Sequence, residues 1–316
     1  MKIPKTAIII TERCYLRPFE VNDAKDFYEM NNDTEVIQYT GDTPFTSVIE
    51  AETFIKNYTA YDNYGFGRWA VCKILDGTFI GFCGLKYHKK GSFVEVGYRF
   101  KKEFWNYGYA TETAKACVSY GFNSLKLPAI YCQVWEDNKA SIRVAEKIGF
   151  NFKTTFIDHG KIAFQFELKN PLTEIKEIDA IETYSVRHPV LRKGRPISDC
   201  AFEGDNLNTT FHLGIYYANV LVGVATFLVN SNTSFLENPQ YQLRGMAILE
   251  NFQKKGYGEH LLKAGEHIVQ SKNVSRIWFN AREIAVSFYQ RLDYKIVGDV
   301  FHIPNIGNHY IMTKTL

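Results

Sequence analysis

The chain has 316 residues, 46% of them hydrophobic and 22% charged, and a formal net charge of +3 at pH 7. This length suits two domains of about 150 residues each, and an aromatic content of 15% favours filled cores over disorder. Because the net charge is small, no basic surface of the kind that binds polyanions is expected, which excludes nucleic acid as the expected ligand.

In the first half, alternating strand and helix periodicities predict a mixed α/β domain. Strands are predicted at residues 8–17, 68–74, 79–85, 93–100, 129–134 and 161–168. Helices are predicted at residues 21–31, 48–64, 109–122 and 138–148. An Asp76-Gly77 pair marks the tip of a hairpin between the second and third of these strands.

The second half repeats this order of elements. "TEIKEI" predicts a strand, "DAIETYSVRHPVL" a helix disturbed by Pro189, and the run around Ala218-Asn219 a hairpin. The turn signal in "LKNPL" sets the boundary near Asn170-Pro171, so the predicted domains are residues 1–170 and 171–316.

Cysteine usage and hydropathy bear on the compartment. The six cysteines lie in apolar contexts without a CxxC pair, which predicts buried free thiols in a reducing, cytoplasmic setting. The most apolar run, residues 216–229, is too short to cross a bilayer, and the N-terminal stretch shows no signal-peptide pattern. We therefore expect no membrane association.

An internal repeat links the two halves. Sliding the chain against itself without gaps places "WNYGYA" on "QKKGYG", so that Trp105 falls on Gln253 and Gly97 on Gly245. After a slip of four residues, "VAEKIGF" falls on "FYQRLDY". These landmarks occur in the same order in both halves, which predicts that the chain contains two copies of one domain with the same kind of site.

Each repeat contains a glycine turn between a strand and a helix. Amides at a helix N-terminus lack partners and point outward, so such a turn can bind an anion that the glycines allow to approach closely. An ordinary glycine-containing loop is the alternative. A Rossmann or P-loop nucleotide site is excluded, because neither turn has GxGxxG or a GK[ST] ending.

The pattern Gln253-x-x-Gly256-x-Gly258 resembles the pyrophosphate-binding turn of the GCN5-related N-acetyltransferase (GNAT) superfamily, and the similarity extends over most of residues 241–300. The resemblance implies acetyl-CoA as co-substrate, no metal, and an α/β fold with a mixed sheet in two tandem domains. The cofactor-binding residues it implies are Trp105, Asn106, Tyr107, Gly108, Tyr109 and Ala110 in the first half and Gln253, Lys254, Lys255, Gly256, Tyr257 and Gly258 in the second.

Residues 9–168 resemble the subgroup that acetylates N-terminal amines of ribosomal proteins. That subgroup commonly has tryptophan at the position of Trp105. Asn106 stands where the subgroup usually has glycine, and asparagine tolerates positive φ better than most residues.

For catalysis in the first half, the strand "FVEVGYRF" alternates, with Val94, Val96, Tyr98 and Phe100 on one face and Phe93, Glu95 and Gly97 on the other. The resemblance favours Glu95 as general base acting through water, whereas a solvated strand glutamate is the alternative. It also implies that Asn138 contacts the ligands and that Ser141 protonates the leaving thiolate. A helix N-cap is the rival interpretation of this pair, and both roles are compatible.

The second half departs from this pattern. The gapless alignment puts Leu243 at the place of Glu95. The resemblance implies that Tyr289 occupies the usual proton-donor position of the superfamily, where the first half, after the slip of four residues, has Ala145. A packed core tyrosine is the alternative for Tyr289. His309, ahead of His302, is the candidate base because histidine titrates near neutral pH, although a lone histidine is more often structural. Asn280 and Arg282 are candidates for lining the cofactor, and a salt-bridged surface arginine is equally compatible.

These observations predict two fused acetyltransferase domains that move an acetyl group from acetyl-CoA to a primary amine. By analogy the acceptor is a peptide or protein N-terminus for the first domain and a small amine for the second, in a monomer or a homodimer. One alternative is that one half is a non-catalytic acyl-CoA-binding or scaffolding module that regulates the other. Another is that neither half binds acyl-CoA and the pair is an interaction scaffold.

Overall fold

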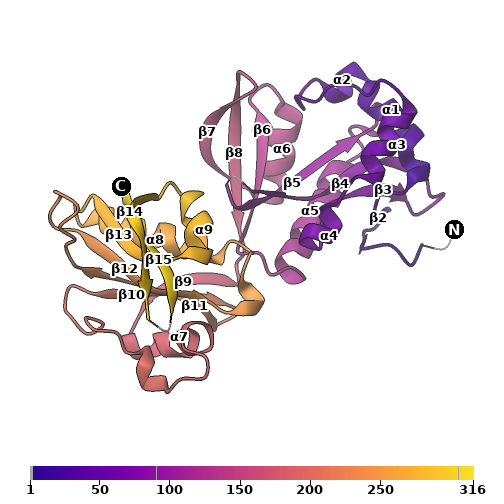
Figure 1. Ribbon diagram of the computed structural model, residues 1–316. Helices are drawn as coiled ribbons and strands as arrows, with labels where there is room; N and C mark the ends of the chain where they lie inside the picture. Colours follow the sequence, from indigo (N-terminus) through magenta and orange to yellow (C-terminus); the bar gives the residue numbers. More distant parts are fainter. Residues whose placement is uncertain (1–2, 90, 305) are drawn as a thin grey trace. The chain divides into compact units, whose positions relative to one another are not determined.

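The computed structural model describes residues 3–89, 91–304 and 306–316. The chain divides into two compact units, which Figure 1 colours from indigo to magenta and from pink to yellow. Residues 3–89 and 93–169 make up the first unit, and residues 91–92 and 170–316 the second. Both are mixed α/β, as the periodicities predict.

The first unit is built on an eight-stranded sheet in the order β1-β2-β3-β4-β5-β6-β8-β7. All neighbours are antiparallel except β5 and β6, which run parallel. The strands are β1 Ile9–Ile10, β2 Cys14–Arg17, β3 Arg68–Lys73, β4 Phe79–His88, β5 Phe93–Phe100, β6 Ala129–Trp135, β7 Asn151–Asp158 and β8 Lys161–Lys169. The α-helices are α1 Ala24–Asn32, α2 Thr34–Ile37, α3 Val48–Lys56, α4 Ala60–Tyr64, α5 Tyr109–Asn123 and α6 Lys139–Ile148, with 3-10 turns at Val21–Asp23 (η1) and Lys102–Phe104 (η2).

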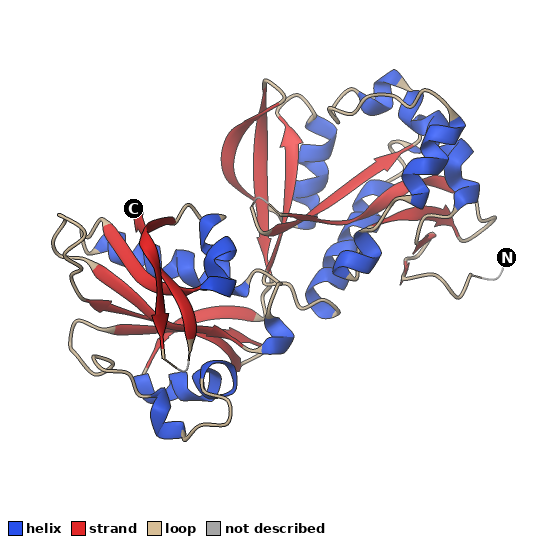
Figure 2. Ribbon diagram, in the orientation of Figure 1, coloured by secondary structure: helices blue, strands red, loops and turns tan. Residues whose placement is uncertain are grey.

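Helices cover both faces of this sheet (Figure 2). Trp69 and Val71 of β3 pack in the core beneath α5, and Ala70 and Cys72 pack in the core with α1 and α3. Successive residues of a strand face opposite sides, so a strand buried on both sides reads as a continuous apolar run.

The first unit differs from its sequence-based expectation in four places, the first of which is the short helix α2, which was not predicted. The predicted strand at 8–17 is divided into β1 and β2, and the predicted helix at 48–64 ends at Lys56 and resumes as α4. β7 is an unpredicted strand, and its residues Asn151–Asp158 are mostly exposed. An edge strand with a polar, exposed sequence carries no apolar alternation by which it could be recognised.

The second unit has a seven-stranded sheet in the order β14-β15-β13-β12-β11-β10-β9, with β12 and β13 parallel. Its strands are β9 Thr173–Ile178, β10 Phe211–Tyr217, β11 Val220–Val229, β12 Tyr241–Ile248, β13 Arg276–Arg282, β14 Lys295–Ile303 and β15 Gly307–Thr315. Its α-helices are α7 Tyr184–Leu191, α8 Tyr257–Ser271 and α9 Val286–Gln290, with 3-10 turns at Ala180–Thr183 (η3), Ile197–Cys200 (η4), Glu250–Phe252 (η5) and Glu283–Ala285 (η6).

In this unit, α8 and α7 cover opposite faces of the sheet. Leu261 and Leu262 of α8 belong to the larger core, and Val186 of α7 packs on Val224 and Ala247 in a smaller one. Pro189 lies inside α7, which ends two residues later, in line with the predicted disturbance.

The β10–β11 hairpin turns at Ala218 and Asn219, as predicted, and both residues have positive φ. Within the described part of the chain, no helix combines the length and the apolar character that a membrane span requires.

Candidate active sites

The two glycine turns have the same backbone shape. Each follows a 3-10 turn and opens a long helix, α5 in the first unit and α8 in the second. Asn106 and Gly108 have φ of 64° and 84°, and Lys254 and Gly256 have φ of 58° and 97°. Because left-handed backbone is uncommon for lysine, the turn imposes this conformation regardless of the side chain. Asn106 does accept positive φ, as expected.

The first residue of each turn makes the same hydrogen bond. Trp105 Nε1 donates to the carbonyl of Phe100 at 2.9 Å, and Gln253 Nε2 donates to the carbonyl of Ile248 at 2.9 Å. Each acceptor is the last residue of the preceding strand. An indole and an amide therefore secure the turn to the strand in the same way, which explains how tryptophan and glutamine exchange here.

The helix N-termini after the turns have no side-chain cap. Gly108 and Gly256 occupy the N-cap positions, and neither has a side chain that could accept a hydrogen bond from the first amides of the helix. These amides, with the helix dipole behind them, form a site suited to an anionic group such as a pyrophosphate. Arg13 also supports the first turn, because its guanidinium donates to the carbonyl of Tyr107 at 2.9 Å and lies 4.4 Å from the ring centroid of Tyr109.

A cavity of about 840 Å³ lies in the first unit, between β5, the glycine turn and α6. Tyr107 does not line it, and its exposed side chain lies outside. The predicted site residues that line the cavity are Glu95, Trp105, Asn106, Gly108, Tyr109, Ala110, Asn138 and Ser141. The fold thus brings the predicted cofactor turn and the predicted catalytic residues of the first half to one cavity.

Parted strands open this cavity. β5 and β6 pair in parallel only at Glu95 and Tyr131, so the strands separate beyond Glu95. The same occurs in the second unit, where β12 and β13 pair only at Tyr241–Ile277 and Gln242–Trp278. Residues 96–98 of β5 and 132–135 of β6 line the cavity on either side of the gap.

Glu95 shares a short hydrogen bond with His88, between Oε2 and Nε2, and both residues line the cavity. The side chains of Glu95 and His88 are 12% and 24% exposed, so the pair is partly shielded and still reachable. The ring of His88 stacks on Phe93 at a centroid distance of 4.7 Å. Sequence reasoning missed His88, because its place beside Glu95 depends on the β4–β5 register.

Asn138 is the N-cap of α6, and its Oδ1 accepts the amide of Ser141 at 3.1 Å. The N-cap interpretation is confirmed, and both residues also line the cavity. Tyr98, placed on the apolar face by the strand alternation, packs on the core and lines the cavity as well. Burial raises the pKa of Tyr98, and a hydrogen bond with Ser141 opposes this shift. Sequence reasoning missed Tyr98 as a site residue because a tyrosine in an apolar alternation reads as core.

The second unit requires a correction to the gapless alignment. β12 carries an extra residue at Gly245, where its pairing with β11 jumps from Thr226–Arg244 to Val224–Ala247. The parallel bridge of Glu95 corresponds to that of Gln242, so Gln242, and not Leu243, is the counterpart of Glu95. By the same shift, Arg244 is the counterpart of Gly97. Gln242 is buried, and its Oε1 accepts from Asn230 at 3.0 Å.

Tyr289 is the counterpart of Ala145. The amide of Phe150 donates to the carbonyl of Ala145, and the amide of Tyr294 donates to the carbonyl of Tyr289. The Tyr289 ring is buried against Phe279, at a centroid distance of 4.3 Å. Burial raises its pKa.

Tyr289 contacts Met246, which in turn lies beside Gly258 of the second turn. Its hydroxyl lies 3.6 Å from the sulfur of Met246. A β-carbon built on Gly258 would lie 3.3 Å from both Met246 and Phe288. In the turn itself, Tyr257 is fully buried, whereas the side chains of Gln253 and Lys254 are exposed.

The candidate histidines lie on the β14–β15 hairpin. His309 is buried, and its Nδ1 donates to the carbonyl of Gly307 at 2.8 Å. His302 is exposed and contacts Asn308. His309 pairs in register with Arg282, which is partly buried at the end of β13, whereas Asn280 on the same strand is exposed.

Both domains therefore share one fold, in which a glycine turn lies beside a pair of parted parallel strands. The acetyltransferase (GNAT) domain family matches residues 13–151, and the acetyltransferase (GNAT) family matches residues 173–294. The chain belongs to the GNAT family of acetyltransferases, with one domain in each half.

Related proteins cover about half of this chain. The uncharacterized N-acetyltransferase YitI of Bacillus subtilis is 38% identical over 46% of this chain and 97% of its own length. A spermidine N(1)-acetyltransferase of Escherichia coli is 28% identical over 43% of this chain and 72% of its own. Among solved structures, a GNAT-family acetyltransferase from Bacillus anthracis is 28% identical, with a TM-score of 0.46, over 51% of this chain and 98% of its own.

Proposed function

We propose that the first domain transfers the acetyl group of acetyl-CoA directly to a primary amine. The observation that carries this proposal is the single cavity lined by the uncapped turn, by Glu95 and by Ser141. In the reaction the amine nitrogen bonds to the thioester carbonyl carbon, and the carbon–sulfur bond breaks. The amine loses one proton, and the departing thiolate gains one.

Glu95 is the proposed general base and receives the amine proton through a water molecule. Its hydrogen bond to His88 fixes the orientation of the carboxylate toward the cavity. Ser141 is the proposed proton donor to the thiolate. Its contact with Tyr98, a phenol that burial keeps protonated, holds the Ser141 hydroxyl in place at the cavity. Backbone amides of β5 beyond Glu95, where the strand has left β6, are the proposed donors to the thioester oxygen.

Both turns are proposed to bind acetyl-CoA through the helix N-terminal amides, with residues 105–110 in the first domain and 253–258 in the second. The acceptor is proposed to be a peptide N-terminus or a small amine. The sequence resemblance to the ribosomal-protein subgroup supports a peptide, and the similarity to a spermidine acetyltransferase supports a small amine. Six buried free cysteines support a reducing, cytoplasmic setting, and a monomer or homodimer is proposed.

For the second domain, two activities are proposed. One is acetyl transfer with Tyr289 as proton donor and His309 as base. The other is acyl-CoA binding without turnover, in a domain that regulates the first. The second activity is favoured by the amide of Gln242 at the place of Glu95. It is also favoured by the imidazole of His309, which contacts the carbonyl of Gly307 and the ring of Phe301, both in the β14–β15 hairpin.

The test is CoA release from acetyl-CoA by the intact protein, with a peptide bearing a free N-terminus and with spermidine as acceptors. The same peptide with an acetylated N-terminus is the control. We expect release with a free amine only. Binding of acetyl-CoA without release for any amine would remove the catalytic proposal and leave the binding one. Absence of acetyl-CoA binding would remove both.

A further inference from the structure

Three arginines of the second domain surround one aromatic ring. The guanidinium carbons of Arg187, Arg192 and Arg244 lie 4.4, 4.9 and 5.4 Å from the ring centroid of Phe202. Arg187 and Arg192 belong to the α7 segment, Arg244 to β12, and Phe202 to the loop after η4. A ring face attracts cations, but three around one ring also repel each other.

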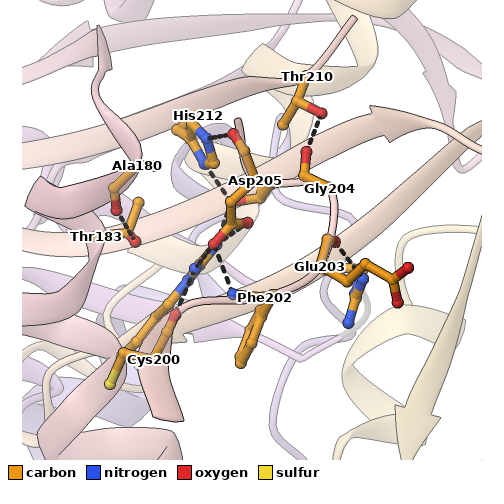
Figure 3. Close-up of polar contacts among 12 residues, drawn as sticks. Ala180, Thr183, Cys200, Phe202, Glu203, Gly204, Asp205, Thr210 and His212 are labelled. Atoms are coloured by element: carbon orange, nitrogen blue, oxygen red, sulfur yellow. Dashed lines mark hydrogen bonds and ion pairs between the residues drawn. The ribbon is translucent and has the colours of Figure 1, made fainter. Parts of the chain in front are cut away.

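The first of these arginines is neutralised. Arg187 is fully buried and pairs with Asp205, with Nη1–Oδ2 and Nη2–Oδ1 distances of 2.6 and 3.2 Å. Figure 3 shows Asp205 between Phe202 and His212, and its Oδ2 also accepts the amide of Phe202 at 2.9 Å. This network fixes the Phe202 loop. It provides a rigid support and no free charge.

The Arg187–Asp205 network and the Phe202 loop pack closely against Gly245 of β12. A β-carbon on Gly245 would lie 2.7 Å from Arg187 and 2.8 Å from Phe202, closer than real β-carbons approach. The residue has φ of 58°, and it is the extra residue of β12, beyond the last residue that pairs with β13. The arginine-bearing loop therefore packs on β12 where that strand has left β13.

Arg192, Arg244 and Arg282, named here the arginine cluster, are not neutralised. Within the described parts of the chain, none of the three forms an ion pair with a carboxylate. Arg192 donates to the carbonyls of Leu191 and Asp199, and Arg244 donates to that of Glu203. Carbonyls are neutral, so the positive charges remain.

Electrostatics links Arg282 to Arg192. The pKa of Arg192 is lowered, first by burial and then by the positive charges of Arg195 and Arg282, against a smaller opposing effect of Asp199. All three members of the cluster are partly exposed, so a solute can reach them. Like charges held together in this way destabilise the domain unless an anion binds between them.

Comparison with the first domain places two members of the cluster at positions whose first-domain counterparts line the cavity. Gly97 and Trp135 line the first-domain cavity, and their counterparts by strand register are Arg244 and Arg282. Ala163, another lining residue, corresponds to His309. Two guanidinium groups and an imidazole thus occupy positions that are uncharged in the first domain.

We propose that the arginine cluster binds the carboxylate or phosphate group of an anionic small molecule, which lies over Phe202 at the second domain's counterpart of the first-domain cavity. Guanidinium groups match either oxyanion with paired hydrogen bonds, and the partly buried ring gives the rest of the ligand an apolar surface. The site is distinct from the turn at α8. It does not require the second domain to be catalytic.

The experiment is calorimetric titration of the intact protein with inorganic phosphate and, separately, with glutarate, both in the presence of saturating CoA. Arg282→Gln and Arg244→Gln remove one donor each, and Lys295→Gln removes an exposed charge elsewhere in the same domain. We expect each arginine variant to weaken binding of at least one probe roughly tenfold, the size of one charged hydrogen bond, and Lys295→Gln to leave it unchanged. The stronger probe then identifies the type of oxyanion.

The melting temperature of Arg282→Gln without ligand separates an effect on folding from an effect on binding. Because the substitution removes one of several charges that repel each other, this melting temperature should equal or exceed that of the wild type. Binding of neither probe overturns the proposal, as does an equal loss in Lys295→Gln, which would indicate a diffuse field. Binding that survives both arginine variants but disappears in Gly256→Trp would assign the anion to the α8 turn and would also overturn it.

Discussion

The glycine turns of the two domains agree in backbone and hydrogen bonding although four of their six residues differ. The residues facing the parted strands, in contrast, have changed their chemistry. Trp105 and Gln253 make equivalent hydrogen bonds, and Asn106 and Lys254 both adopt positive φ. An anion site made of backbone amides tolerates side-chain change. Catalysis depends on side chains, and there Glu95 of one domain is matched by Gln242 of the other.

The sharpest way to test the shared part is to block one turn at a time. Gly108→Trp and Gly256→Trp each introduce a bulky residue at positive φ, where a side chain is strained. We expect titration of acetyl-CoA to fall from two sites to one in each variant, with affinity at the blocked turn reduced about a hundredfold or more. Gly65→Trp is the control, because Gly65 also has positive φ and open space around it. Loss of both sites in one variant would mean that the domains do not bind independently.

The difference at the strands predicts a large effect of Glu95→Gln. This substitution keeps the shape and removes the base, so we expect kcat to fall about a hundredfold or more while the KM for acetyl-CoA stays the same. His88→Ala should cost less, roughly tenfold, because it removes only the residue that orients the carboxylate. Initial rates with the best acceptor measure both. Full activity of Glu95→Gln would assign proton removal to another group.

The proposed proton donors predict a smaller effect. Ser141→Ala, measured in the Gly256→Trp background, and Tyr289→Phe, measured in the Gly108→Trp background, should each lower kcat roughly tenfold. An unchanged rate for Tyr289→Phe with acetyl-CoA binding retained would favour the non-catalytic second domain. Because burial raises the pKa values of Tyr98 and Tyr289, both phenols keep their protons as the pH rises, so neither should add an alkaline limb to the rate profile up to pH 9.

The smallest effect concerns the cysteines, all six of which are buried and free. Burial raises the pKa of Cys72 to about 11 and that of Cys14 and Cys132 to about 12. A thiol with a pKa of 11 is about one-thousandth thiolate at pH 8, so the native protein should react slowly with Ellman's reagent. The denatured protein should release all six equivalents. Fast reaction of a native thiol would contradict this burial.

Strong local patterns predicted much of the fold. The alternation of Val94, Val96 and Phe100 located β5, and the glycine turn located the start of α5. β7 was missed because an exposed edge strand needs no apolar alternation. The candidate site was predicted where it depends on consecutive residues, as in the turns.

Contacts between distant segments could not be predicted in the same way. His88 reaches Glu95 through hairpin register, and Arg13 reaches the first turn from the start of the sheet. The gapless alignment misplaced the counterpart of Glu95, because one extra residue at Gly245 shifts all of β12 before it. An insertion inside a strand leaves no local signature when the inserted residue is itself the expected glycine.

Corresponding segments of the two domains differ in length only at particular places. The offset between the domains stays constant from Tyr98 to Asn123 and from Met246 to Ser271, through the end of the strand, the turn and the whole following helix. Outside this block the offset changes at a bulge, in a loop and again before the last helix. Residues 98–123 and 246–271 are therefore segments of equal length that could be exchanged between the domains. Each segment ends where the two domains already differ in length, so the exchange would not change the length of any other strand.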